Sequence, residues 1–421
     1  MNGKTIPLKE GIFWVALAVY LFVLPIAGTI GMRYLAFVVL IGVTVAVLIE
    51  TRRIPPLPFA GYWLAYFLVA LVSVFFAVAP AVSLSELRVE VIYCMVIFVI
   101  GVTWGGRALG LEPFAILLAV INGALTASAF YFASLDMPLS EVMRIPGFAR
   151  AGMDGNWLLV TVFLNSWLGW RLWNSGHRAA PILLTVLVVL DVWAMLASHN
   201  RQNLVALGAG IATAAVLLLH TRFSWRRAAF FLGLLIVVAA LLVTQMQRRS
   251  DPGIAPPPDS PSVATAVDRA GDIVGTATTS DVRWKLWKFS LQKIMENPWT
   301  GGGIGRTVFD KLYPEFMPEN PQLWHAHNMI LNRGIQMGIP GMIVFAALWM
   351  ALAVEVLRYA RLPSSSRYLA IAGLAAIVAI FAKNLTDDFF VRNSALFFWL
   401  FAGYLIGCLR TGPVRVSTGE P

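Results

Sequence analysis

The sequence has few charged residues and only two cysteines, and both shortages exclude common classes of protein. Of its 421 residues 13% are charged and 58% are hydrophobic, and the mean hydropathy is +0.74. Soluble globular proteins are nearer to about a quarter charged, so this composition indicates a chain that is embedded in lipid. Cys94 and Cys408 both fall within apolar stretches, which argues against a disulfide framework or a cysteine metal cluster.

Apolar runs of membrane-spanning length recur along the chain, and about 20 helical residues cross a hydrocarbon core roughly 30 Å thick. We expect helices over residues 11–30, 34–50, 59–79, 88–104, 112–133, 157–174, 179–197, 203–220, 228–246, 337–357, 367–385 and 393–409. The sequence therefore predicts an all-α polytopic membrane protein with about 12 transmembrane helices and one large periplasmic loop. Residues 1–246 would hold helices 1–9, residues 247–327 the loop, and residues 328–421 helices 10–12 with a short cytoplasmic tail.

Basic residues set the expected orientation, because cytoplasmic loops carry an excess of Lys and Arg. With the N-terminus inside, each cytoplasmic segment has at least one basic residue, whereas the opposite orientation would place Arg222, Arg226 and Arg227 outside. Both termini are then cytoplasmic, with the chain in a bacterial inner membrane.

Many arginines nevertheless fall on the predicted outer side, so positive residues inside do not explain the whole net charge of +10. These outer arginines include Arg33, Arg88, Arg144, Arg150, Arg201, Arg283, Arg306, Arg333 and Arg392. An anionic substrate would explain them, since guanidinium groups bind phosphate through forked hydrogen bonds. Solvated loop charges and contacts with lipid headgroups are the alternatives.

The long outer loop has two parts. Asp251–Thr279 is rich in Pro, Ser, Thr, Ala and Gly, and we expect it to be mobile and poorly packed. A helix follows near 281–296, with Ser280 or Asp281 as its N-cap and Asn297 after its end. The apolar positions expected on one of its faces are Trp284, Trp287, Leu291, Ile294 and Met295. Such a basic amphipathic helix fits either a membrane interface or a packed position on the bundle.

A glycine-rich stretch, Pro298–Gly305, follows that helix. It lacks the Gly-Lys-Ser/Thr ending of a phosphate-binding loop and does not join a strand to a helix. Its turn residues indicate a close approach of the backbone to a helix or a ligand.

Histidine is scarce, and two of the five histidines stand together in the segment His325-Ala326-His327. Histidine is the side chain best suited to take up a proton near neutral pH. His-x-His could also bind a metal, but Asp387 and Asp388 form the one compact acidic pair on the outer side. We therefore expect no metal and no cofactor.

The histidine segment carries a resemblance to a known family. His327-Asn328, nine residues, Gly338, two residues and Gly341 resemble the signature of O-antigen ligases, within the O-antigen ligase and polymerase superfamily. Ser198-His199-Asn200-Arg201 is similar to that family's segment with an essential arginine, although His199 and Asn200 depart from its usual small residues. Arg283, Trp287 and the following glycine stretch look like part of its large periplasmic loop.

The resemblance implies a GT-C-like glycosyltransferase that transfers polysaccharide from undecaprenyl pyrophosphate to a sugar hydroxyl of lipid A-core. His327 would be the general base, and Arg201 and Arg283, with Arg88 as a weaker candidate, would bind the pyrophosphate without a metal ion. The reaction would invert the anomeric configuration. Asn328 or an outer carboxylate such as Asp388 could orient the base, and Asp388 could instead bind the acceptor hydroxyl.

Other residues and readings stay open. His325 would line the substrate site or support its structure. Asp191 lies within an apolar run, where a buried carboxylate is energetically costly and is often functional. An O-antigen polymerase or a protein O-oligosaccharyltransferase would use the same lipid-linked donor. A transporter of lipid-linked glycans would fit twelve spans, but the sequence shows no convincing repeat of its halves. Membrane lipids are expected partners and nucleic acid is not.

Overall fold

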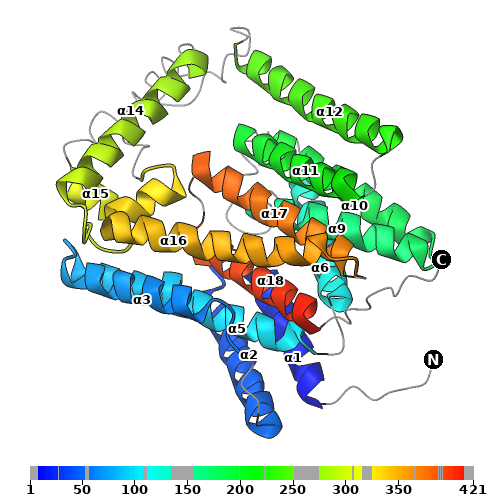
Figure 1. The fold of residues 1–421 in the computed structure, drawn as a ribbon, viewed down its shortest axis with the longest axis horizontal. Coiled ribbons are helices and arrows are strands. Elements are labelled where there is room, and N and C mark those ends of the chain that lie inside the picture. Colours follow the sequence, from blue (N-terminus) through cyan, green and yellow to red (C-terminus); the bar gives the residue numbers. More distant parts are fainter. Residues whose placement is uncertain are drawn as a thin grey trace.

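A computed structural model describes most of the chain. The described residues are 8–26, 28–52, 56–107, 111–133, 155–198, 200–221, 224–250, 275–305, 308–314, 325–364, 366–386, 388, 390 and 392–411. Within these ranges the protein is built from helices, with no strand (Figure 1). The predicted all-α class is confirmed.

The helices follow the apolar runs of the sequence, although their bounds differ from those predicted. They are α1 (Leu8–Val23), α2 (Ile30–Thr51), α3 (Ala60–Phe75), α4 (Pro80–Leu87), the π-helix η1 (Arg88–Ile92), α5 (Tyr93–Gly105), α6 (Glu112–Ala133), α9 (Gly155–Asn174), α10 (Ala179–Ala197), α11 (Arg201–Thr221), α12 (Trp225–Ser250), α14 (Gly275–Glu296), α15 (Val308–Leu312), α16 (Met329–Arg361), α17 (Arg367–Thr386) and α18 (Arg392–Thr411).

Seven helical stretches in the described part of the chain are long and apolar enough to cross a membrane. They are Ile30–Thr51, Pro80–Gly105, Ala179–Leu196, Arg201–His220, Met329–Arg361, Arg367–Thr386 and Arg392–Thr411. Three apolar helices are shorter: Ala60–Phe75, Glu112–Ser128 and Ala228–Leu241. The structure thus supports a membrane protein, whereas the count of about 12 crossings and the periplasmic side of the loop stay predictions.

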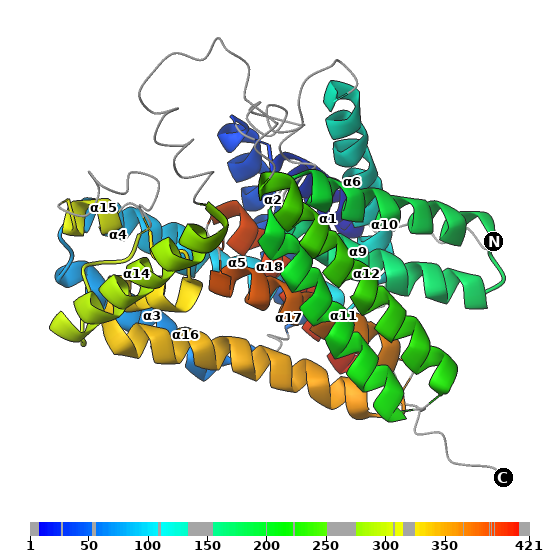
Figure 2. The same ribbon diagram turned by 90° about the horizontal axis from the view of Figure 1, so that it is seen from above.

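The helices pack as a bundle with α5 and α18 near its centre (Figures 1 and 2). Besides the α5–α18 contact, α11 packs against α17, α9 against α10, and α16 against α17 and α3. Helix α14 lies at one end of the bundle, where it contacts the beginning of α16. We call this the His327 end, because His327 lies two residues before the first residue of α16.

The α5–α18 contact depends on glycines spaced four residues apart on both helices. Gly101 and Gly105 of α5 face the backbone of α18, and Gly403 and Gly407 of α18 face the backbone of α5. A Cβ at Gly101 would lie 2.6 Å from the carbonyl oxygen of Leu400, closer than real side chains come. Small residues at this spacing let helices in lipid approach until their backbones touch, which maximises van der Waals contact.

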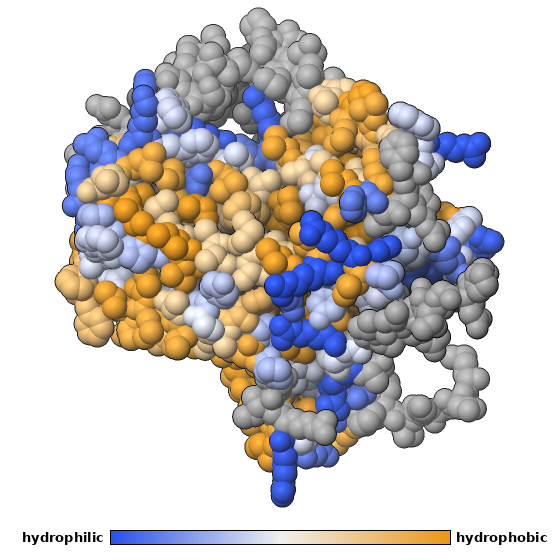
Figure 3. All heavy atoms as spheres, viewed as in Figure 1, coloured by the Kyte–Doolittle hydropathy of each residue, from blue (hydrophilic) through white to orange (hydrophobic). Residues whose placement is uncertain are grey.

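The surface is apolar over broad areas. On the face seen in Figure 3, hydrophobic residues form continuous areas, and hydrophilic residues gather at the upper left and in a band right of the centre. Ile49 of α2 and Leu183 of α10 are each about 70% exposed. Soluble monomers rarely expose such large contiguous apolar surfaces, and lipid is the solvent that suits them.

Candidate active site

The candidate site is organised by a break in α16. Gly338 has φ +69°, outside the helical range, so Met329–Arg361 consists of a short first part and a long second part. Pro340 follows the break, and its ring is compatible with the first turn of a new helix. A Cβ at Gly338 would clash with the backbone of Pro298 and Trp299. The first glycine of the signature is therefore required by the backbone, both for its positive φ and for a close contact.

The glycine stretch, Pro298–Gly305, packs against α16 at this break. The N–H groups of Gly302 and Gly303 donate to the carbonyls of Ile335 (2.9 Å) and Gln336 (3.0 Å). In return, Ile339 N–H donates to Pro298 O at 2.7 Å. The loop thus satisfies carbonyl and N–H groups that the break leaves without helical partners. The predicted close approach of this backbone is observed, and its partner is helix α16.

His327 lies in a short turn directly before α16. Its own φ is +46°, which is uncommon for a residue with a side chain. The backbone N–H of His327 donates to Nδ1 of His325 at 3.0 Å, and the two rings lie 3.9 Å apart between centroids. His325 is buried and His327 is partly exposed. His325 therefore supports the turn that presents His327, which agrees with the structural reading of His325.

Asn328 caps the first turn of α16. Its Oδ1 accepts hydrogen bonds from the N–H groups of Ile330 (3.0 Å) and Leu331 (3.1 Å). This is the standard N-cap geometry, in which a side-chain oxygen satisfies otherwise unpaired helix N–H groups. The cap fixes where α16 begins and so fixes the position of His327 relative to the helix. A direct contact of Asn328 with substrate stays a prediction.

Two of the predicted arginines are brought to the same place by α14 and α11. Trp287 of α14 donates from Nε1 to the carbonyl of Ala326 at 3.1 Å, which ties α14 to the histidine turn. Arg283 lies one helical turn before Trp287. With its amide oxygen turned toward α14, Gln202 accepts from the Arg283 guanidinium at 2.8 Å. Gln202 directly follows Arg201, the first residue of α11, and Ala326 directly precedes His327, so α14 connects the start of α11 to the histidine turn.

The faces of α14 differ from the prediction. The helix begins at Gly275, so Ser280 and Asp281 are not its N-cap. Its buried residues are Leu286, Ser290 and Ile294, of which Ile294 contacts the first part of α16 beside Gly334. The predicted face is split, because Ile294 is buried whereas Trp284, Leu291 and Met295 are exposed. One face thus packs on the bundle and another presents apolar side chains outward, and a membrane interface for the outward face stays a prediction.

Asp388 joins the segment between α17 and α18 to the first part of α16. It is buried, and its Oδ2 accepts from Nδ2 of Asn332 at 2.7 Å. Its Oδ1 accepts from the N–H of Phe390 at 3.3 Å. Asn332 lies in the first turns of α16, near His327 in the chain. The carboxylate therefore holds the α16 start in place, and its role toward base or acceptor stays a prediction.

A buried ion pair near the site was not singled out as a functional pair from the sequence. Arg333 Nη1 contacts Glu90 Oε2 at 2.6 Å and Gln336 Oε1 at 2.7 Å, with both charged side chains almost fully buried. Glu90 lies in η1, where one extra residue per turn changes the rotation of the chain before α5. The sequence did offer one signal for this pair. Glu90 is an ionisable residue within the fourth predicted transmembrane helix, and burying such a residue in lipid is energetically unfavourable and commonly serves a function.

Arg88 lies elsewhere at the His327 end. It is exposed in η1 and lines a cavity between α2, η1 and α18, together with Arg33 and Arg392. Its role as a weaker pyrophosphate ligand therefore stays a prediction. His199, Arg144, Arg150, Arg306, Asp387 and residues 251–274 lie outside the described residues.

Asp191 is completely buried inside the bundle. Its carboxylate accepts from Asn122 Nδ2 at 2.8 Å, Thr126 Oγ1 at 3.4 Å and Thr161 Oγ1 at 3.1 Å. Asn122 in turn accepts from Nε1 of Trp157 at 3.1 Å. Asp191 thus connects α10 to α6 and α9, as interhelical hydrogen bonds do in lipid. These contacts describe a structural tie between three helices.

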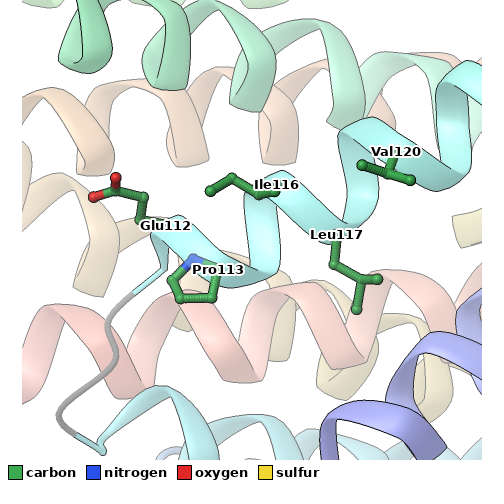
Figure 4. A pocket seen from close by; sticks show the side chains of 5 residues that line it. All are labelled: Glu112, Pro113, Ile116, Leu117 and Val120. Atoms are coloured by element: carbon green, nitrogen blue, oxygen red, sulfur yellow. The ribbon is translucent and has the colours of Figure 1, made fainter. Parts of the chain in front are cut away.

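A cavity away from the candidate site and the lack of a metal-binding group among the described residues complete the description. A cavity of about 460 Å³ is lined by Glu112, Pro113, Ile116, Leu117 and Val120, all from α6 (Figure 4). Glu112 forms an ion pair with Arg171 in the last turn of α9. The first turn of α9 lies at the His327 end of the bundle. The cavity therefore lies at the end of the bundle opposite to His327. Among the described residues no group of three His, Cys, Asp or Glu could hold a metal ion.

Comparison with known proteins supports the family resemblance. A family model described as O-Antigen ligase matches residues 183–346, from within α10 to the second part of α16. This stretch contains Asp191, Arg201, Arg283 and His327. A Rickettsia conorii protein with the name "Putative polysaccharide ligase" is 23% identical over 240 residues, which cover 55% of this chain. The chain spans about half the length of that relative, 52% of it.

Proposed function

Because residues 183–346 match the O-antigen ligase family, we propose that this protein is an O-antigen ligase-type glycosyltransferase. It would transfer a polysaccharide from undecaprenyl pyrophosphate to a sugar hydroxyl of lipid A-core. The family match supports the coarser activity, a polysaccharide ligase or polymerase acting on a lipid-linked glycan in a membrane. The observation that carries the finer proposal is the set of contacts that joins the histidine turn to Trp287, Arg283 and the start of α11.

His327 is the proposed general base. A sugar hydroxyl is a weak nucleophile, so a base must take its proton as the anomeric carbon is attacked. His327 takes the hydroxyl proton while the hydroxyl oxygen forms the new glycosidic bond. The bond from the anomeric carbon to the pyrophosphate oxygen breaks, and its electron pair leaves with undecaprenyl pyrophosphate. Attack from the face opposite the leaving group inverts the anomeric configuration.

Arg201 and Arg283 are the proposed ligands of the pyrophosphate. Negative charge grows on the leaving oxygen, and preorganised guanidinium groups stabilise it without a divalent ion. The N-terminus of α11, which begins at Arg201, adds a partial positive charge at the same place. Gln202 holds the Arg283 guanidinium through its amide oxygen, which fixes its position before the substrate arrives.

The proposed cellular setting follows the sequence. The protein would span a bacterial inner membrane with both termini in the cytoplasm and the His327 end in the periplasm. The exposed apolar residues of α14, among them Trp284 and Leu291, would lie at the membrane interface, where tryptophan rings are favoured.

A transfer assay with two acceptors tests the proposal. The protein in nanodiscs is mixed with an undecaprenyl-pyrophosphate-linked glycan and lipid A-core, with and without EDTA. Glycan on lipid A-core, at the same rate in EDTA, is the expected result. Longer lipid-linked glycan would identify a polymerase, and glycan on an added protein acceptor an oligosaccharyltransferase. Folded protein that transfers glycan to none of these acceptors would overturn the proposal and favour a transporter.

A further inference from the structure

A second group of arginines lines a cavity apart from Arg201 and Arg283. The cavity, of about 230 Å³, lies between α2, η1 and α18. It is at the His327 end, because Arg392 begins α18 four residues after Asp388, which bonds to the first part of α16. The charged residues that line it are Arg33, Arg88, Arg392 and Glu86.

The charges of the cavity do not cancel. Glu86 forms an ion pair with Arg392, and this pair is neutral as a unit. Neither Arg33 nor Arg88 has a carboxylate within ion-pair distance among the described residues. Arg33 is held by Asn393 and by the carbonyl of Ile26, and Arg88 lies 5.9 Å from the ring of Tyr93. Two positive charges without a carboxylate partner among the described residues therefore line one small cavity.

Two buried donors on the cavity wall also have unused hydrogen-bonding capacity. The Nε of Arg33 and the hydroxyl of Tyr20 are buried, and neither has a hydrogen-bond partner among the described residues. Buried donors without acceptors are unfavourable and are rare in folded proteins. An anion in the cavity could accept from both donors and neutralise both arginines.

The surroundings of the cavity favour a lipid over a free ion. Part of the lining is apolar, including Phe37 and Val89, and Ile30 and Leu35 on the adjoining turns of α2 are exposed. The cavity is smaller than the roughly 300–1,000 Å³ of sites that enclose whole drug-sized ligands, so it suits a headgroup whose chains lie outside. Helix α2 is among the stretches long and apolar enough to cross a membrane.

We propose that this cavity binds the phosphomonoester headgroup of a lipid, with Arg33 and Arg88 as its cationic ligands. A phosphomonoester carries about −1.5 to −2 charges at pH 7, which matches two arginines. A phosphodiester carries one charge and would leave one arginine without compensation. The site is distinct from the pyrophosphate site proposed at Arg201 and Arg283, and it would give Arg88 a role other than that of a weaker pyrophosphate ligand.

Native mass spectrometry of the full chain in detergent tests this site with three probes: phosphatidic acid, phosphatidylglycerol and inorganic phosphate. We expect phosphatidic acid to bind about tenfold more tightly than phosphatidylglycerol, with no comparable retention of inorganic phosphate. Arg88→Gln should weaken phosphatidic acid binding about tenfold and remove most of the preference. Arg88→Lys, which keeps the charge, should restore much of it. The matched control is Lys288→Gln, an exposed cation on α14 that does not line the cavity.

Arg33 also hydrogen-bonds to Asn393 at the start of α18, so Arg33→Gln could weaken binding by destabilising the fold. Its binding is therefore compared with its melting curve, and the main test of the site is Arg88→Gln. Equal affinity for the two lipids would overturn the phosphomonoester assignment. Equal binding by native protein and Arg88→Gln would overturn the site. Retention of inorganic phosphate as tight as that of phosphatidic acid would overturn the lipid assignment.

Discussion

In the α5–α18 pair, glycines let two helix backbones touch, whereas at the break in α16 they let a loop enter beside the histidine turn. The first contact is apolar along its length and contains no charged residue from Gly101 to Gly105 or from Gly403 to Gly407. The second is surrounded by caps, a buried ion pair and residues with positive φ. The same residue type therefore supports stability in one region and the geometry of a reactive site in the other.

The largest expected effect is on the α5–α18 contact. Gly105→Leu would place a side chain against the backbone of Tyr404, which cannot move aside as a flexible side chain can. We expect loss of most folded protein, measured as the monodisperse peak in fluorescence-detected size exclusion. Gly42→Leu in α2, where nothing lies within 4 Å of the added Cβ, is the matched control and should fold normally. Equal yields for both variants would show that the close approach is not needed.

The next effect concerns the buried pair of Arg333 and Glu90. Removing one partner leaves a buried charge and typically costs about 3–5 kcal/mol, whereas removing both can be nearly neutral. Arg333→Met should therefore lower the melting temperature more than the double variant with Glu90→Gln does. A double-mutant cycle from melting curves measures this, and additive losses would contradict a direct pairing.

Arg283 should affect the reaction and leave the fold intact. Loss of one preorganised donor to a developing charge typically lowers the rate by about 10²–10³-fold. Arg283→Gln should do so in the transfer assay, with an unchanged melting temperature. Lys288→Gln, on an exposed position of the same helix, should retain the native rate. A native rate for Arg283→Gln would remove this arginine from the proposed pyrophosphate site.

The smallest effect is expected at the cap of α16. Asn328→Ala removes the acceptor of two helix N–H groups, and such a loss costs about 1 kcal/mol. Asn328→Asp keeps an acceptor and should preserve the stability. Melting curves of both variants check this, and an equal loss for Asp and Ala would argue against a capping role.

The sequence was informative wherever a local pattern determines the structure. Apolar runs predicted helices, because a helix is the form that satisfies its own backbone in lipid. The glycine stretch predicted a close backbone contact, and the histidine signature pointed to the family that the comparison supports. The spacings Gly101-x-x-x-Gly105 and Gly403-x-x-x-Gly407 also follow the small-residue pattern of closely packed membrane helices.

Features that depend on distant pairing could not be predicted. Glu90 and Arg333 are 243 residues apart, and no local signal selects one as the partner of the other. The break at Gly338 is matched by a contact with another segment, as the hydrogen bond from Gly302 N–H to Ile335 O illustrates. The exposed face of α14 likewise depends on which side the start of α16 covers.

The most direct test of the account is the transfer rate of His327→Ala in nanodiscs, compared with that of His220→Ala. His220 is an exposed histidine in the last turn of α11, away from the histidine turn. Loss of a general base typically lowers a rate by about 10²–10⁴-fold. We predict such a loss of glycan transfer to lipid A-core for His327→Ala, with an unchanged melting temperature and a native rate for His220→Ala. Transfer by folded His327→Ala at the native rate would contradict the central claim that His327 performs the proton transfer.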